Sequence, residues 1–138
     1  METPITIDGA VGGGQLVRTA VALSALMGKA IRMKNIRASR SSPGFRPQHI
    51  TAVRAIATLV NAEADGLKVG STDLLFQPRS KIAGFLSLDV GTAGSISLIL
   101  QAALPVAMFA PEPVTLLVRG GTDVPWSPPI DYLRLVFI

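Results

Sequence analysis

The residues of this sequence best suited to chemistry lie in a segment rich in arginine, serine and glycine. Arg37, Arg40 and Arg46 shortly precede His49, the single histidine of the chain. The planar fork of a guanidinium matches two oxygens of a phosphate, so arginines at this density suit phosphate recognition. A histidine near the start of a helix tends to be neutral or to donate a hydrogen bond to an anion. Two interpretations of His49 stay open, anion contact and a purely structural place.

A glycine-rich loop precedes this segment. Gly12, Gly13 and Gly14 lie between an expected strand at 5–8 and an expected helix at 15–27. Glycines let the backbone approach an anion, and the helix start supplies free N–H groups. The loop matches neither the Walker pattern nor the dinucleotide fingerprint, so a phosphate loop and a simple tight turn both stay open. Arg18, one turn into the helix, either reaches back to the same anion or points into solvent.

A second glycine turn, at 91–95, adds two hydroxyl groups to the same arrangement. Gln101 follows it on an otherwise apolar helix. A buried amide without partners costs roughly 1–3 kcal/mol, so Gln101 must bond to backbone, water or a ligand. Trp126 lies in a proline-rich segment, where it either stacks on a base or packs as a loop anchor.

The elements that position these residues follow a pattern that repeats. Apolar periodicity predicts a β-α-β-α-β-β unit, with strands at 5–8, 31–36, 67–69 and 74–76 and helices at 15–27 and 48–61. The pattern restarts with a strand at 86–90, a helix at 95–110, a strand at 114–118 and a helix near Pro129. A shift of 81 residues superimposes Asp8 on Asp89 and Pro47 on Pro128. We therefore expect an α+β fold, an α/β sandwich, with a first repeat at 1–80 and an incomplete second repeat at 81–138.

Composition narrows the class of protein. The chain has 138 residues, 13 Lys and Arg against 9 Asp and Glu, a net charge of +4 and no cysteine. These numbers exclude a disulfide scaffold and thiolate metal sites, and no cluster of His, Asp or Glu has metal-ligand spacing. No apolar run reaches the ~18 residues of a membrane span, and no secretory signal opens the chain. We expect a soluble, cytoplasmic protein. Its basic segment at 32–46 is either a phosphate-attracting surface or an ordinary solvated one.

The last residues, 133–138, are apolar and lack a helix cap. Leu, Val and Phe side chains at an uncapped helix end are normally buried against other protein. We expect either further chain downstream or a partner, such as a second copy in a homodimer.

Five collinear stretches resemble the RNA 3′-terminal phosphate cyclase family: 7–29, 36–55, 69–78, 89–106 and 119–134. The motifs are P-G-F-R-P-Q-H at 43–49, G-T-A-G-S at 91–95 and G-G-T-D-V-P-W-S-P-P at 120–129. The resemblance implies repeats like the C-terminal domain of translation initiation factor 3, with about one and two-thirds copies present. It also implies an enzyme that uses ATP, with Mg²⁺ or Mn²⁺, to convert an RNA 3′-phosphate into a 2′,3′-cyclic phosphate. AMP would pass from an enzyme histidine to the RNA phosphate, and the 2′-hydroxyl would then displace it.

The resemblance also assigns residues to roles. Contacts with phosphates or the RNA end fall to Arg18, Arg37, Arg40 and His49. Contacts with the nucleotide fall to Gln101, Gly12, Gly13, Gly14, Pro128 and Pro129. The partners implied are ATP and RNA 3′-phosphate ends, with no membrane.

Two departures from the family pattern leave a second function open. The first glycine loop is two residues short and lacks the family glutamate that helps bind metal and nucleotide. Family members are also more than twice as long, and their adenylylated histidine lies beyond the part that this chain matches, so we expect no catalytic nucleophile here and an inactive chain on its own. The alternative is a non-catalytic RNA- or nucleotide-binding protein of RNA processing or ribosome assembly.

Overall fold

The computed structural model describes residues 2–80, 84–90 and 94–137. Its strands are β1 (Ile5–Asp8), β2 (Ile31–Lys34), β3 (Glu63–Asp65), β4 (Leu74–Gln77), β5 (Gly84–Asp89) and β6 (Val114–Arg119). Its main helices are α1 (Gly14–Met27), α2 (Pro47–Leu59) and α3 (Ile96–Met108). A short helix, α4 (Ile130–Tyr132), runs into a π-helical turn, η1 (Leu133–Phe137). No helix among the described residues is long and apolar enough to cross a membrane.

The first sheet has the strand order β1-β2-β4-β3. β1 pairs parallel to β2, whereas β4 pairs antiparallel to both β2 and β3. The element order over residues 5–77 is therefore the predicted β-α-β-α-β-β. Ile31 and Met33 of β2, with Leu74 and Phe76 of β4, are buried beneath the helices.

One predicted strand is wrong. Residues 67–69 form a turn, and the strand that closes the sheet is β3, four residues earlier. Gly66 ends β3 in a left-handed conformation with φ 94°. β3 carries two carboxylates at the sheet edge, with Glu63 in an ion pair with Arg79. Its stability comes from backbone pairing with β4, which an apolar pattern does not reveal.

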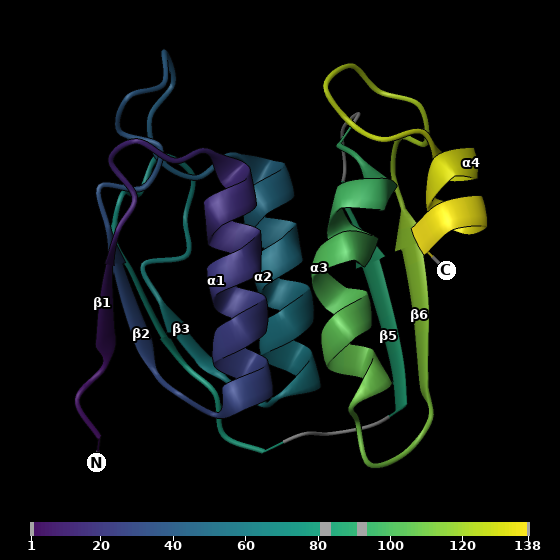
Figure 1. Ribbon diagram of the computed structural model, residues 1–138, viewed down its shortest axis with the longest axis horizontal. Coiled ribbons are helices and arrows are strands. Elements are labelled where there is room, and N and C mark those ends of the chain that lie inside the picture. The colour runs from purple at the N-terminus through teal and green to yellow at the C-terminus, as the bar shows by residue number, and fades with distance from the viewer. Residues whose placement is uncertain (1, 81–83, 91–93, 138) are drawn as a thin grey trace.

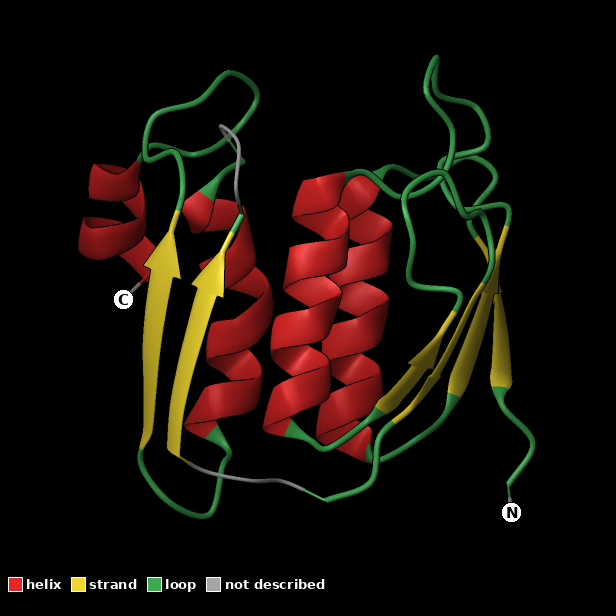
Figure 2. Cartoon of the chain, turned by 180° about the vertical axis from the view of Figure 1, so that it is seen from behind, coloured by secondary structure: helices red, strands yellow, loops and turns green. Residues whose placement is uncertain are grey.

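The second sheet contains β5 and β6, which pair parallel in the register Leu86↔Leu116. Figures 1 and 2 show α1, α2 and α3 packed together between the two sheets, with α1 and α2 toward the first and α3 toward the second. Both β1-α1-β2 and β5-α3-β6 are thus parallel β-α-β units. The α/β sandwich class agrees with this arrangement. The repeat count and the boundary at residue 80 stay predictions, and the adjoining residues 81–83 lie outside the described ranges.

Small and branched apolar side chains hold the three helices together. Val21 of α1, Val53 of α2 and Ile99 of α3 are buried, and alanines such as Ala55 and Ala103 are buried beside them. Short side chains let neighbouring helix axes approach closely. The result is one core shared by both sheets.

The carboxyl ends of the parallel strands lie at one end of the molecule. In Figure 1 the loops that follow β1, β2 and β6 all emerge at the top, where α1 and α2 also begin. Ligands of open α/β sheets bind outside the carboxyl ends of strands. The loops that carry the candidate residues thus share one edge of the fold.

Candidate anion-binding site

Hydrogen bonds fix the glycine loop at its first residue. Asp8, at the end of β1, accepts from Asn35 Nδ2 at 3.1 Å and from Ala10 N at 2.9 Å. These bonds hold the pKa of this exposed carboxyl below its usual value. Gly13 precedes α1 in an extended conformation, and no side chain caps the helix. The free N–H groups of the first turn are therefore available to an anion.

Three cationic or polar side chains converge on this loop. A Cβ atom placed on Gly13 would lie 2.6 Å from Arg40 Nη2. One placed on Gly14 would overlap the His49 ring at Nε2 and lie 3.0 Å from Arg18 Nη1. The structure therefore brings together four predicted features: the glycine loop, Arg18, Arg40 and His49.

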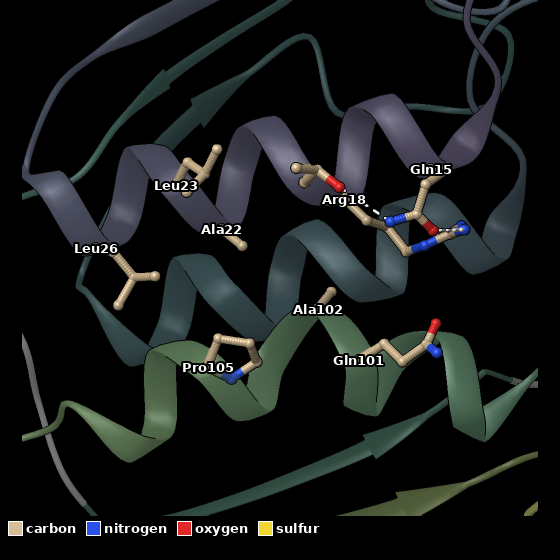
Figure 3. Close-up of a pocket in the computed structure, with 9 residues that line it drawn as sticks. Gln15, Arg18, Ala22, Leu23, Leu26, Gln101, Ala102 and Pro105 are labelled. Carbon is tan, nitrogen blue, oxygen red and sulfur yellow. Dashed lines mark hydrogen bonds between the residues drawn. The ribbon is translucent and has the colours of Figure 1, made fainter. Parts of the chain in front are cut away.

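Arg18 is the most enclosed cation of the site. Only 8% of the residue is exposed, so the solvated interpretation is wrong. Its Nη2 donates to Gln15 Oε1 at 3.0 Å, and Gln15 Nε2 donates to Thr19 Oγ1 at 2.9 Å (Figure 3). Its Nε has no hydrogen-bond partner among the described residues, and burial lowers its pKa. A buried charge without a counterion is costly, which favours a bound anion beside it.

Arg37 holds the arginine loop closed. Its Nη1 donates to Ser42 O at 2.8 Å and Gly44 O at 2.7 Å, and its backbone is left-handed with φ 51°. Burial, followed by the charges of Arg40 and Arg46, lowers its pKa. Two bonds to carbonyl groups make the Arg37 guanidinium a brace for the loop.

His49 is the third residue of α2 and is only 3% exposed. The backbone N–H of Arg46 donates to its Nδ1 at 3.0 Å. Burial is the main cause that lowers its pKa to about 4, and the charges of Arg37, Arg18 and Arg46 add to it. The imidazole is therefore neutral at pH 7.

No carboxylate of the described residues forms an ion pair with this cluster. Within the described ranges the ion pairs are Lys29–Glu2, Arg79–Glu63 and Arg134–Asp131, none of which involves the four arginines around His49. The same ranges contain no group of three or more His, Cys, Asp or Glu side chains that could hold a metal ion. The site is built to hold negative charge.

A pocket of about 170 Å³ lies between α1 and α3 beside Arg18. Figure 3 shows Gln15, Arg18 and Gln101 gathered at one end of it. Ala22, Leu23, Leu26, Ala102 and Pro105 make the remainder apolar. Gln101 thus joins the arginine site from the helix that follows the second glycine turn.

Pro128 and Pro129 do not line this pocket. Their loop is tied to the start of α3 by a hydrogen bond between the hydroxyl groups of Ser127 and Ser95. Trp126 in the same loop is 100% exposed, so it is not a loop anchor within this chain. Of the predicted second glycine turn, residues 91–93 lie outside the described ranges.

Two groups that orient side chains of the site were not identified from the sequence. Gln15 orients the Arg18 guanidinium, and its three-residue spacing from Arg18 on a helix was a usable signal. The backbone amide of Arg46 orients His49, and a residue's type gives no signal for such a contact.

Comparison with known proteins gives one consistent family. Residues 10–138 match the family model described as RNA 3′-terminal phosphate cyclase. Proteins named "RNA 3′-terminal phosphate cyclase" from Hyperthermus butylicus and Ignicoccus hospitalis are each 56% identical over 96% of this chain. One from Pyrococcus abyssi is 52% identical over 96%. The chain covers 37%, 38% and 39% of these three relatives, respectively.

Proposed function

Because the chain belongs to the RNA 3′-terminal phosphate cyclase family, we propose that it forms the phosphate-binding part of an ATP-dependent cyclase acting on RNA 3′-phosphate ends. The observation that supports this most directly is the buried Arg18, which has no carboxylate partner within the described ranges and lies beside a glycine loop, His49 and Arg40. Such a cluster stabilises phosphate oxygens and rejects a neutral 3′-hydroxyl end. The cytoplasmic location expected from the sequence belongs to the same proposal.

In the proposed reaction the RNA 3′-phosphate first accepts AMP from an adenylylated histidine, so that a phosphorus–nitrogen bond breaks and a phosphoanhydride forms. The neighbouring 2′-hydroxyl then attacks the 3′-phosphorus, so that a bond to the 2′-oxygen forms and the bond to AMP breaks. Arg18 and Arg40 would bind the phosphate oxygens and orient them for this attack. His49 is a poor nucleophile, because its ring is buried and its Nδ1 lone pair already accepts from Arg46 N. The adenylylated histidine is therefore proposed to lie outside this chain.

ATP is the proposed nucleotide, and the residues present fit its phosphate groups. Gln101 at the polar end of the pocket offers a donor and an acceptor to the rest of the nucleotide. A protein-held Mg²⁺ or Mn²⁺ does not fit the described residues, because these ions prefer carboxylate ligands and the cluster is cationic. We therefore derive no step through the metal that the resemblance implies.

Binding of two RNAs that differ only at the end tests this function. We expect this chain to bind an oligonucleotide with a 3′-phosphate about tenfold more tightly than its 3′-hydroxyl counterpart. Arg18→Gln should abolish most of that preference. Arg54→Gln removes the same charge from an exposed position on α2 and should leave the preference intact. Equal binding of both RNAs by the unaltered chain would overturn the proposal.

One observation favours the second candidate, a non-catalytic RNA- or nucleotide-binding protein. The glycine loop reads Gly9-Ala-Val-Gly-Gly-Gly-Gln15 and has no glutamate, and the described residues offer no metal cluster. Incubation of the natural full-length protein with ATP labelled on its α-phosphate distinguishes the two. A labelled protein band supports the cyclase, and binding of ATP or RNA without any label supports the non-catalytic protein.

A further inference from the structure

The hydrogen bonds around His49 indicate how this site holds an anion, an inference that rests on the proposed function. We propose that His49 contacts the bound phosphate as a neutral hydrogen-bond donor through Nε2–H, in a tautomer selected by the backbone N–H of Arg46. The histidine is then neither a base nor a cation in the reaction. It is a fixed dipole among arginines.

The tautomer follows from one contact. A backbone N–H donates only to a nitrogen that carries a lone pair, and Arg46 N donates to Nδ1 at 3.0 Å. In a neutral imidazole the single proton then resides on Nε2. The geometry is local, because Arg46 is the residue before α2, Pro47 opens the helix and His49 lies in its first turn.

The free donor faces the glycine loop. A Cβ on Gly14 would overlap Nε2, so only a residue without a side chain leaves room there. His49 is 3% exposed, and its Nε2 is not one of the fully buried polar atoms without a partner among the described residues, so Nε2 remains within reach of a bound ligand. Arg18 approaches the same glycine with its Nη1, and Arg18 Nε is buried without a hydrogen-bond partner among the described residues. An anionic oxygen bound beside this glycine would accept from both Nε2–H and Arg18 Nη1.

The surroundings keep the ring neutral. Four arginines place positive charge near the ring: Arg18 on α1, Arg37 and Arg40 in the arginine loop, and Arg46 before α2. No carboxylate of the described residues forms an ion pair with any of them. A bound phosphate would offset part of this repulsion. The Nδ1 lone pair stays engaged by the backbone, however, so a second proton has no open nitrogen to occupy.

Because the chain has a single histidine, ¹⁵N NMR of the whole chain reads this ring without assignment. Between about pH 5.5 and 8 we expect a protonated Nε2 and an unprotonated Nδ1. A saturating RNA with a 3′-phosphate should shift the Nε2–H resonances and leave Nδ1 almost unchanged, whereas the 3′-hydroxyl RNA should not. An Nδ1–H tautomer, a titration near pH 6.5, or an unmoved Nε2–H in the saturated complex would each overturn the proposal.

Two variants test the role in binding. His49→Gln retains a side-chain N–H donor and should retain most of the preference for the 3′-phosphate end. His49→Phe fills the space without a donor and should lose about tenfold. The preference of the unaltered chain should be flat from about pH 5.5 to 8, and equal losses in both variants would contradict a donor role.

Failure of the RNA function is distinguishable from failure of this inference. If the RNAs do not bind but inorganic pyrophosphate shifts Nε2–H, the donor role stands and the RNA function fails. If pyrophosphate and the 3′-phosphate RNA both leave Nε2–H unmoved, the donor role is overturned.

Discussion

Gly13 and Gly14 are adjacent in the chain, but Gly14 faces buried side chains and Gly13 faces an exposed side chain that can move. A Cβ on Gly14 would overlap the buried His49 ring and meet Arg18, whereas a Cβ on Gly13 would meet the end of the exposed Arg40 side chain. Overpacking against buried groups costs about 1–3 kcal/mol, and an exposed side chain moves away cheaply. We expect Gly14→Ala to lower the free energy of unfolding by that amount and Gly13→Ala by less than about 1 kcal/mol. Urea unfolding of both variants measures this, and equal losses would contradict the assigned packing.

The buried imidazole predicts a pH dependence of stability. The pKa of His49 is about 4 in the fold and 6.5 when unperturbed. Between these values the unfolded chain binds more protons than the folded one, so stability is full above pH 6.5 and falls as the pH drops toward 4. We expect a loss of the order of 1–2 kcal/mol between pH 7 and 5.

Urea midpoints at several pH values measure this loss. His49→Gln removes the titrating group and should flatten the pH dependence over the same interval. A pH dependence that persists unchanged in this variant would contradict the expectation, because other groups would then titrate in this interval.

At the scale of elements, the arginine loop and the proline-rich loop each contain one aromatic residue, and only the one in the arginine loop is buried. Phe45 is fully buried, its N–H donates to Ser71 O and its carbonyl accepts from Gly70 N, so it fastens the arginine loop. Trp126 is fully exposed in the proline-rich loop. We expect Phe45→Ala to cost about 3–5 kcal/mol and Trp126→Ala less than about 0.5 kcal/mol, measured by urea unfolding. A large cost at Trp126 would mean that this loop packs differently.

The elements with strong apolar periodicity were predictable. The strand at 5–8, the helix at 15–27 and the helix at 48–61 lie within two residues of β1, α1 and α2. β3 was not predictable, because its mostly polar residues form a strand only through backbone pairing with β4, which an apolar pattern does not reveal. The residue types likewise predicted that the loop at 37–47 is cationic. The individual roles of the arginines were not predictable, because Arg37 stabilises the loop and Arg18 is a buried donor only through contacts that the fold creates.

At the scale of the whole molecule, the outer faces of the two sheets differ in polarity. Arg32 pairs with Thr6 in the first sheet, and Leu117 pairs with Ser87 in the equivalent place of the second. Leu117 and Phe85 are both exposed, as are Leu135 and Val136 near the end of the chain. Exposed apolar surface of this kind promotes association.

We therefore expect this chain to self-associate as its concentration rises. Leu117→Arg gives the second sheet the arginine that the first sheet has in the equivalent place, and it should reduce the association. Thr115→Ser, at an exposed position of the same strand, serves as a control. Sedimentation velocity over a range of concentrations measures the effect. A monodisperse monomer at all concentrations would contradict the expectation.

The Arg46–His49 contact has a consequence for protein engineering. Both partners of this hydrogen bond belong to one four-residue segment, so the segment itself supplies the contact that orients the ring. A segment Arg-Pro-Gln-His grafted onto the start of a helix in an unrelated scaffold should carry the same donor with it. A designed receptor for phosphate would keep this donor uncharged in mildly acidic media only if its scaffold also buries the ring beside cationic side chains, because burial and the neighbouring arginines lower the pKa of His49.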